Sequence, residues 1–141
     1  MAHVHAPGLV LKFDPQVLAS QGATFAGSDD TEYSPQFFVC LESGPRDALW
    51  IPLFAAPGPG RKGIAAAAKS GHSLWTRNSS FYDPGELCRI GHKVVQKAAE
   101  AARDPSTPKA PNRLALDQLP PRAEFPDDAA FRPMAGHATI R

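Results

Sequence analysis

The chain has 141 residues, of which 43% are hydrophobic and 21% charged, and its net charge is +1 at pH 7. This length is typical of one domain, since domains run to roughly 100–200 residues, and the composition argues against a globally disordered chain. No run approaches the roughly 20 apolar residues that a membrane-spanning helix needs, so no membrane contact is expected.

Charge and proline are unevenly distributed along this sequence. Residues 1–60 hold two basic and six acidic side chains, residues 61–103 hold eight basic and three acidic, and residues 104–141 hold five of each. Seven of the 15 prolines lie after residue 104. The basic segment 61–103 indicates a surface for nucleic acid or another acidic partner, although the solvated face of a helix gives the same count.

The first half of the chain predicts strands. GLVLKF, residues 8–13, is a short apolar run between prolines and predicts a first or edge strand, and a short helical turn is expected at 15–18. The runs FFVCLES and ALWIPLFA are joined by a Gly-Pro-Arg-Asp turn at 44–47 and predict a β-hairpin. Pro52 indicates an edge, a bulge or the end of the second strand, because proline cannot donate to a sheet.

The basic segment predicts a helical turn, a second hairpin and a helix. Residues 63–69, GIAAAAK, are strong helix formers with enough length for one or two turns. Residues 74–82 predict a strand that turns at the Asp-Pro-Gly of 83–85 and returns at 86–90. In residues 92–103 the apolar side chains recur at the spacing of one helical face, and the Asp-Pro that follows ends the helix.

The remaining segment predicts an extended tail. Its prolines disfavour regular structure, while its large apolar side chains are more frequent than in a disordered linker. These anchors are Leu114, Leu116, Leu119, Phe125, Phe131 and Met134. We expect one globular β-rich domain at residues 1–104 and a proline-rich tail at 105–141, whose anchors dock either on the protein's own body or on another chain.

Two groups of side chains raise the question of a metal site. His3 and His5 would share one side of an extended strand, but two histidines fall short of the three or four protein ligands of zinc sites. Asp29, Asp30 and Glu32 could hold a divalent cation, yet they lack the alternation of a calcium loop, so solvated loop charge is the favoured interpretation. Neither a metal nor a cofactor is predicted.

The two cysteines, Cys40 and Cys88, lie inside apolar runs, where a free thiol behaves as a small hydrophobic residue. No CxxC pair occurs, and the start MAHVHAPG lacks the basic start and long apolar run of a secretory signal. We expect both thiols to be buried and reduced, and we expect a cytoplasmic protein.

Basic and aromatic side chains in the segment 61–103 carry a nucleic-acid hypothesis. Lysine and arginine neutralise phosphates and an exposed ring can stack on a base, so the combination suits RNA or single-stranded DNA. Trp75 and Arg77 share a sheet face if their strand is regular, although a tryptophan in a sheet is more often a core residue. The residues expected to bind nucleic acid are Arg61, Lys62, Lys69, Trp75 and Arg77.

His72, Arg77 and Arg89 also allow a catalytic interpretation. Histidine titrates near neutrality and can act as general acid or base beside an arginine that stabilises the charge developing during RNA cleavage. The alternative is that His72 simply lies in a loop. No GxSxG, HExxH or P-loop pattern occurs, so the familiar hydrolase, metalloprotease and nucleotide-binding interpretations have no support.

Two runs that follow one another between residues 35 and 95 carry a family resemblance. They are PQFFVCLESGPRDALWIPLFAAPGPGR and SGHSLWTRNSSFYDPGELCRIGHKVV. In order and spacing they resemble the core of PemK/MazF-like toxins, in which a valine-rich strand leads to a strand with an apolar-proline step, a variable loop, a hairpin and a helix. The resemblance implies an SH3-like small barrel and a toxin-like endoribonuclease.

These patterns predict a mainly β (α+β) fold. We expect a small antiparallel SH3-like barrel or curved sheet with one C-terminal helix and a proline-rich tail, and an α+β sandwich is the alternative. The first function hypothesis is a nucleic-acid-binding barrel, with a toxin-like endoribonuclease as its special case. The second is a non-enzymatic interaction or assembly protein, of phage or mobile-element type, whose residues 105–141 clasp a protein partner. A homo-oligomer is compatible with either.

Overall fold

The computed structural model describes residues 6–27, 36–104 and 111–133. Two short strands, β5 (Lys62–Gly63) and β7 (Phe81–Tyr82), form a ribbon of their own. The large sheet contains β1 (Leu9–Phe13), β2 (Thr24–Ala26), β3 (Gln36–Ser43), β4 (Asp47–Pro52), β6 (Lys69–Ser70), β8 (Leu87–Gly91), β9 (Asn112–Leu114) and β10 (Arg132–Pro133).

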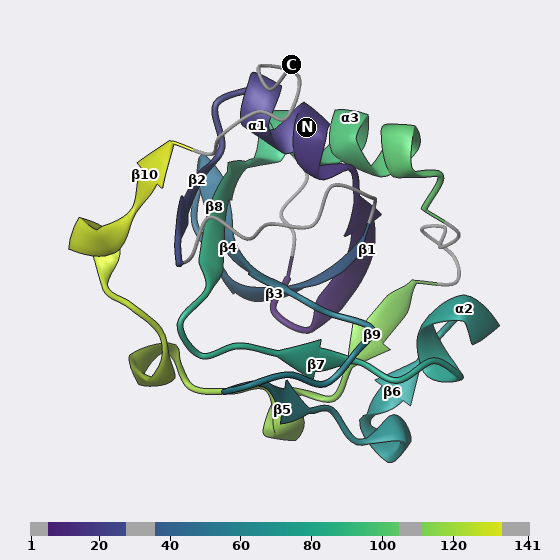
Figure 1. Cartoon of the computed structure of the whole chain (residues 1–141). Coiled ribbons are helices and arrows are strands. Elements are labelled where there is room, and N and C mark those ends of the chain that lie inside the picture. Colours follow the sequence, from purple (N-terminus) through teal and green to yellow (C-terminus); the bar gives the residue numbers. More distant parts are fainter. Residues whose placement is uncertain (1–5, 28–35, 105–110, 134–141) are drawn as a thin grey trace.

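The large sheet is antiparallel throughout, in the order β10-β2-β8-β4-β3-β1-β9-β6. Its strands curve around a common interior (Figure 1), while the end strands β10 and β6 are not paired with each other. The predicted mainly β fold is therefore confirmed, in the form of an open and curved sheet.

The central hairpin joins β3 to β4, as the sequence predicted. Cys40 lies opposite Trp50 in its register. The Gly44 N–H donates to the Asp47 carbonyl at 2.8 Å and closes the turn between the strands. Pro52 is the last residue of β4, which is one of the three positions expected for it.

Alternation along β3 sends successive side chains to opposite faces of the sheet and builds two hydrophobic clusters. Phe38 joins the first cluster, where the Phe13 ring packs edge-on at 5.0 Å from the ring of Trp50. Val39 joins the second cluster, together with Trp75. Helices α1 (Pro15–Ser20) and α3 (His92–Ala102) contribute to the first cluster, and helix α2 (Ser73–Thr76) and the β5-β7 ribbon contribute to the second.

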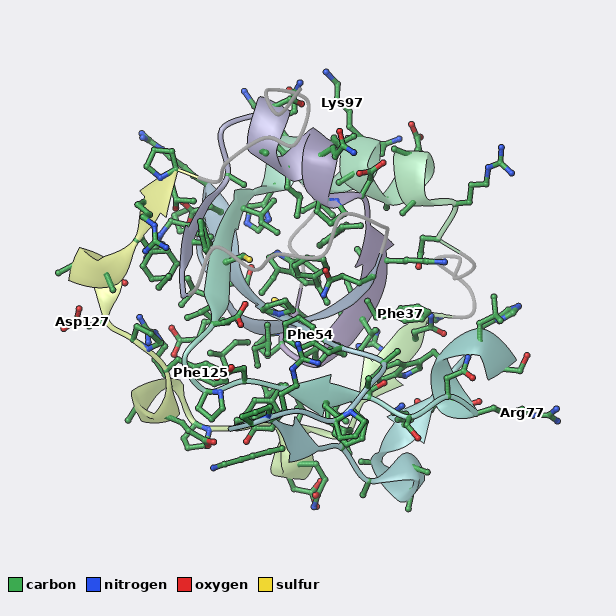
Figure 2. The ribbon with its side chains drawn as sticks, in the orientation of Figure 1. Phe37, Phe54, Arg77, Lys97, Phe125 and Asp127 are labelled. Carbon is green, nitrogen blue, oxygen red and sulfur yellow. The ribbon has the colours of Figure 1, made fainter. Side chains whose placement is uncertain are left out.

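Helix α3 has the predicted periodicity. Val95, Ala98 and Ala102 are buried, whereas Lys97 is exposed and extends into solvent (Figure 2). The helix ends at Ala102, and the next residue, Arg103, has the left-handed conformation of a helix terminus, with a φ of 56°. Strands and 3-10 turns follow α3, so it is not the last element of the chain.

The predicted second hairpin is wrong. Most of residues 74–82 is not extended, and only the two residues of β7 form a strand there. β7 pairs with β5, whereas β8 pairs with β2 and β4. The Asp-Pro-Gly turn is present, and the Glu86 N–H donates to the Asp83 carbonyl at 3.0 Å. This turn joins strands that belong to different sheets.

Two interactions explain why α2 is a helix. The Nδ1 atom of His72 accepts a hydrogen bond from the Leu74 N–H at 3.1 Å, which satisfies a donor that the first helical turn leaves free. Trp75, the third residue of α2, is fully buried in the second cluster. Of the one or two helical turns expected at 63–69, the structure has one, a 3-10 turn at Ala66–Ala68.

The described part of the tail packs on the protein's own body. β9 lies between β1 and β6, and β10 pairs with β2. Leu114 and Phe125 are buried, whereas Leu116 is 67% exposed. The chain between these strands forms the 3-10 turns η2 (Leu116–Gln118), η3 (Arg122–Glu124) and η4 (Asp128–Ala130). The other parts of the predicted tail, 105–110 and 134–141, lie outside the described residues.

Cys40 and Cys88 are buried free thiols, as expected. Burial raises the pKa of Cys40 to about 12 and raises that of Cys88 as well. His3, His5 and the acidic cluster at 29–32 lie outside the described residues. In the described part of the chain, no helix is long and apolar enough to cross a membrane, and no three His, Cys, Asp or Glu side chains are grouped to hold a metal ion.

Candidate nucleic-acid interface

The residues predicted to bind or cleave nucleic acid fall into three separate places. Arg61 and Lys62 lie at the β5-β7 ribbon, and Arg89 lies on β8. The third place is α2 with the neighbouring strand β6, and it holds Lys69, His72, Trp75 and Arg77.

Lys69 is buried, at 9% exposure, and its ammonium group is used inside the protein. It donates to the Trp75 carbonyl at 3.2 Å, to the Asn78 carbonyl at 2.6 Å and to Ser80 Oγ at 2.8 Å. It also lies 4.2 Å from the centre of the Trp75 ring. Burial lowers the pKa of Lys69. This cation therefore fixes the turn after α2 and does not face a phosphate chain.

Trp75 is fully buried and presents no ring face to a base. Its Nε1 donates to the Arg113 carbonyl at 3.1 Å, and its ring lies 5.6 Å from the ring of Phe37. The expectation that Trp75 and Arg77 share a sheet face is wrong, because this segment is helical. Trp75 instead anchors α2 to the sheet.

Arg61 and Lys62 both have partners within the fold. The Arg61 guanidinium lies 3.8 Å from the centre of the Phe54 ring, and its Nη1 donates to the Ala56 carbonyl at 2.9 Å. Lys62 Nζ lies 2.7 Å from Glu124 Oε1, although the lysine side chain remains 57% exposed. These contacts connect the β5-β7 ribbon to the preceding loop and to the tail.

Arg89 lies beside an open groove of about 940 Å³ between the β3-β4 turn and the tail, here named the strap groove. It pairs with Asp47 at 3.3 Å and with Asp128 at 2.8 Å, and Arg122 pairs with the same Asp128 oxygen at 3.2 Å. The charged side chains that line the groove are Glu42, Asp47, Asp127, Asp128, Arg89 and Arg122. Carboxylates outnumber guanidiniums there, which disfavours a polyanion.

His72 and Arg77 are the two predicted residues exposed at α2. The His72 backbone N–H donates to Asn112 Oδ1 at 2.7 Å, which ties the start of α2 to β9. Arg77 follows the last residue of α2 and extends into solvent (Figure 2). In the same view Asp127, beside the strap groove, lies on the opposite side of the molecule. His72 and Arg77 therefore flank the two ends of α2, whereas Arg89 lies on β8 beside the strap groove.

A pocket of about 380 Å³, here named the α2 pocket, opens between α2 and the sheet. Lys12 and Phe37 contribute from β1 and β3, and Leu74 contributes from α2. The remaining lining residues are Gln36, Leu53, Phe54, Ala55, Asn78, Ser79 and Ser80. Lys12 Nζ lies 5.9 Å from the centre of the Phe37 ring. Among the described residues that line the pocket, Lys12 is the one with a charge.

Lys12 and Phe37 were not among the binding residues predicted from the sequence. Two signals point to them in the sequence. Lys12 is the one charged residue inside the apolar run GLVLKF, and Phe37 is the first of two adjacent aromatic residues, which a strand must send to opposite faces. Neither signal shows that α2, 37 residues further along from Phe37 to Leu74, returns to cover both.

Comparisons of this chain with protein families, with curated proteins and with solved structures found no match. The ammonium group of Lys12 and two partly exposed apolar side chains, Phe37 and Leu74, line the α2 pocket, and the exposed guanidinium of Arg77 follows α2. This set suits a ligand with anionic and planar apolar parts.

Proposed function

We propose that the protein binds single-stranded RNA or DNA on the surface formed by α2 and the α2 pocket. The observation that carries this proposal is that Lys12 lines a pocket without a carboxylate among its described lining residues, while Arg77 is exposed directly after α2. Cations neutralise backbone phosphates, and apolar side chains receive bases. The strap groove is less suited, because its lining is rich in carboxylates.

The proposal includes two narrower statements. The curved sheet would be an SH3-like small barrel of the PemK/MazF kind, and the protein would act in the cytoplasm. Cleavage of RNA is the least supported part, because acid-base catalysis needs its groups within hydrogen-bond reach of one substrate. His72 and Arg77 can meet one substrate at α2, whereas Arg89 is held by Asp47 and Asp128.

The alternative is a protein that clasps a partner with residues 105–141. It has less support than nucleic-acid binding, since two apolar anchors of the tail, Leu114 and Phe125, are buried in the protein's own second cluster. A side chain that is already buried in its own fold is not available to a partner.

The test is a fluorescence titration of a labelled single-stranded oligonucleotide at two salt concentrations. We expect binding at low salt that weakens steeply as salt rises, and we expect Arg77→Ala to weaken it further. Losing one phosphate contact to a single strand should lower the slope of log K against log salt by about 0.7.

The control is Arg46→Ala, which removes another exposed arginine, in the β3-β4 turn away from α2. It should leave the salt slope unchanged. An equal loss in both variants would show that net charge alone drives the binding, and no binding by the wild type at low salt would contradict the proposal.

A further inference from the structure

We propose that the α2 pocket receives one unpaired nucleobase of the bound strand, while Lys12 and Arg77 hold the phosphates on either side of it. This inference rests on the proposed function and adds the chemical form of the ligand. The protein would require a nucleotide whose base is free of stacking and pairing, and a chain of phosphates alone would not satisfy it.

The walls of the pocket are suited to a flat apolar ring. Phe37 is partly exposed, and its ring is supported from within by the Trp75 ring at 5.6 Å. Leu74 is 49% exposed, and among the described residues Leu74 and Leu116 are the two large hydrophobic side chains that are exposed. An exposed leucine across from a phenylalanine leaves apolar surface in water, which a base would cover.

The size of the pocket suits one base. Its volume of about 380 Å³ falls within the ~300–1,000 Å³ of small-ligand sites. Leu53 and Phe54 are buried and form its apolar floor. A base inside a duplex cannot enter such a pocket without first leaving the stack, which costs a few kcal/mol, so an unpaired strand is the favoured ligand.

Polar groups at the rim can hold the rest of a nucleotide. Lys12 Nζ is only 5.9 Å from the centre of the Phe37 ring, so its flexible side chain can reach a phosphate beside a stacked base. On the other side, Asn78 Nδ2 donates to the Leu74 carbonyl at 2.8 Å, which leaves the Asn78 side-chain oxygen as an acceptor for an exocyclic amine. Arg77 precedes Asn78 directly in the chain.

The wall that carries these groups is fixed before any ligand arrives. Lys69 donates to the Asn78 carbonyl and to Ser80 Oγ, and both residues line the pocket. In Figure 2, Phe37 and Arg77 lie on the same side of the molecule. A preformed wall lowers the ordering cost of binding, so a pocket of this size can discriminate between ligands.

The test uses one variant of the stacking ring and a matched pair of exposed leucines. Leu74→Ala removes the outer wall of the pocket, while Leu116→Ala removes an equally large side chain on η2 that does not line the pocket.

All three variants are titrated with the same labelled oligonucleotide. Phe37→Leu should lower the affinity about fivefold to 100-fold, as the loss of a stacked base does. Leu74→Ala should lower it by a smaller factor, and Leu116→Ala should leave it unchanged.

A competition experiment tests the base directly. Nucleoside 5′-monophosphates should displace the oligonucleotide from the wild-type protein at concentrations where ribose 5-phosphate and inorganic phosphate do not. Equal competition by ribose 5-phosphate would overturn the inference. Circular dichroism and thermal unfolding check that Phe37→Leu folds. If Phe37→Leu does not fold, the affinity of Leu74→Ala for the oligonucleotide tests the base pocket in its place.

The possible outcomes separate this inference from the proposed function. If Arg77→Ala weakens binding while Phe37→Leu and Leu74→Ala bind as the wild type does, the strand is bound by its phosphates and the base pocket is excluded. If the wild type binds no oligonucleotide at low salt, the proposed function itself fails, and the base pocket fails with it.

Discussion

At the scale of single residues, Lys69 is a charged side chain that the sequence suggests is exposed but that the fold buries. Its ammonium group has three oxygen partners and an aromatic ring around it. Hydrogen bonds to a charged group are stronger than those between neutral groups, and losing one partner leaves the others unsatisfied. The lysine that looked like a phosphate ligand is therefore a structural cation.

Replacing Lys69 by methionine should destabilise the protein. The Trp75 and Asn78 carbonyls and Ser80 Oγ would lose their donor, at a cost of roughly 1–3 kcal/mol in the free energy of unfolding. Urea unfolding followed by circular dichroism measures this change. Lys97→Met, at an exposed position on α3, is the matched control and should change the free energy by less than about 0.5 kcal/mol. Equal changes in the free energy of unfolding for Lys69→Met and Lys97→Met would mean that the hydrogen bonds of the buried ammonium group do not stabilise the fold.

At the scale of elements, two were predicted well because the signals that define them lie close together in the sequence. The β3-β4 hairpin has its turn residues between its strands, and α3 shows its buried face in the spacing of Val95, Ala98 and Ala102. α2 was missed because LWTRNSSFY has the composition of a strand, while the burial of Trp75 depends on Phe37 and on β9. The α2 pocket was missed for the same reason, since its walls include residues from three distant elements, β1, β3 and α2.

The junction between β6 and α2 depends on glycine at position 71. Its φ is +125°, and a β-carbon there would collide with the Asn112 side chain and backbone. Gly22 also has a positive φ, of +88°, but a β-carbon there meets nothing within 4 Å. Gly22→Ala should therefore lower the free energy of unfolding by the backbone strain alone, roughly 1 kcal/mol. Gly71→Ala should lower it clearly more, because the collision with Asn112 is added to the strain. Thermal unfolding of the two variants checks this order, and equal losses would contradict the packing argument.

At the scale of the whole molecule, the tail is fastened by charges as well as by apolar anchors. Glu124 accepts from Lys62 at 2.7 Å and from the Tyr82 hydroxyl at 2.8 Å, and Asp128 binds two arginines. The hydrogen bonds from Lys62 and Tyr82 lower the pKa of Glu124 below its ordinary value of 4.5.

This lowered pKa makes the fastening sensitive to acid. A carboxyl group whose pKa is lower in the folded state stabilises the fold above its ordinary pKa, and this contribution is lost as the pH falls below about 4.5. On going from pH 6 to a pH below about 4.5, the free energy of unfolding of the wild type should therefore fall more than that of Glu124→Gln. Thermal unfolding at a series of pH values gives the comparison, and parallel curves for the two proteins would refute it.

The place of β9 in the sheet has a consequence for how the chain is made. β9 comes from residues 112–114, yet it is the strand that connects β6 to β1. Until the ribosome has released those residues, the hydrogen-bonding edge of β1 is open and β6 has no neighbour in the sheet. A nascent chain in this state carries an unprotected strand edge, which is a template for aggregation. The β1 edge of the sheet is therefore completed only after residues 112–114 have been made, and β9 then protects that edge.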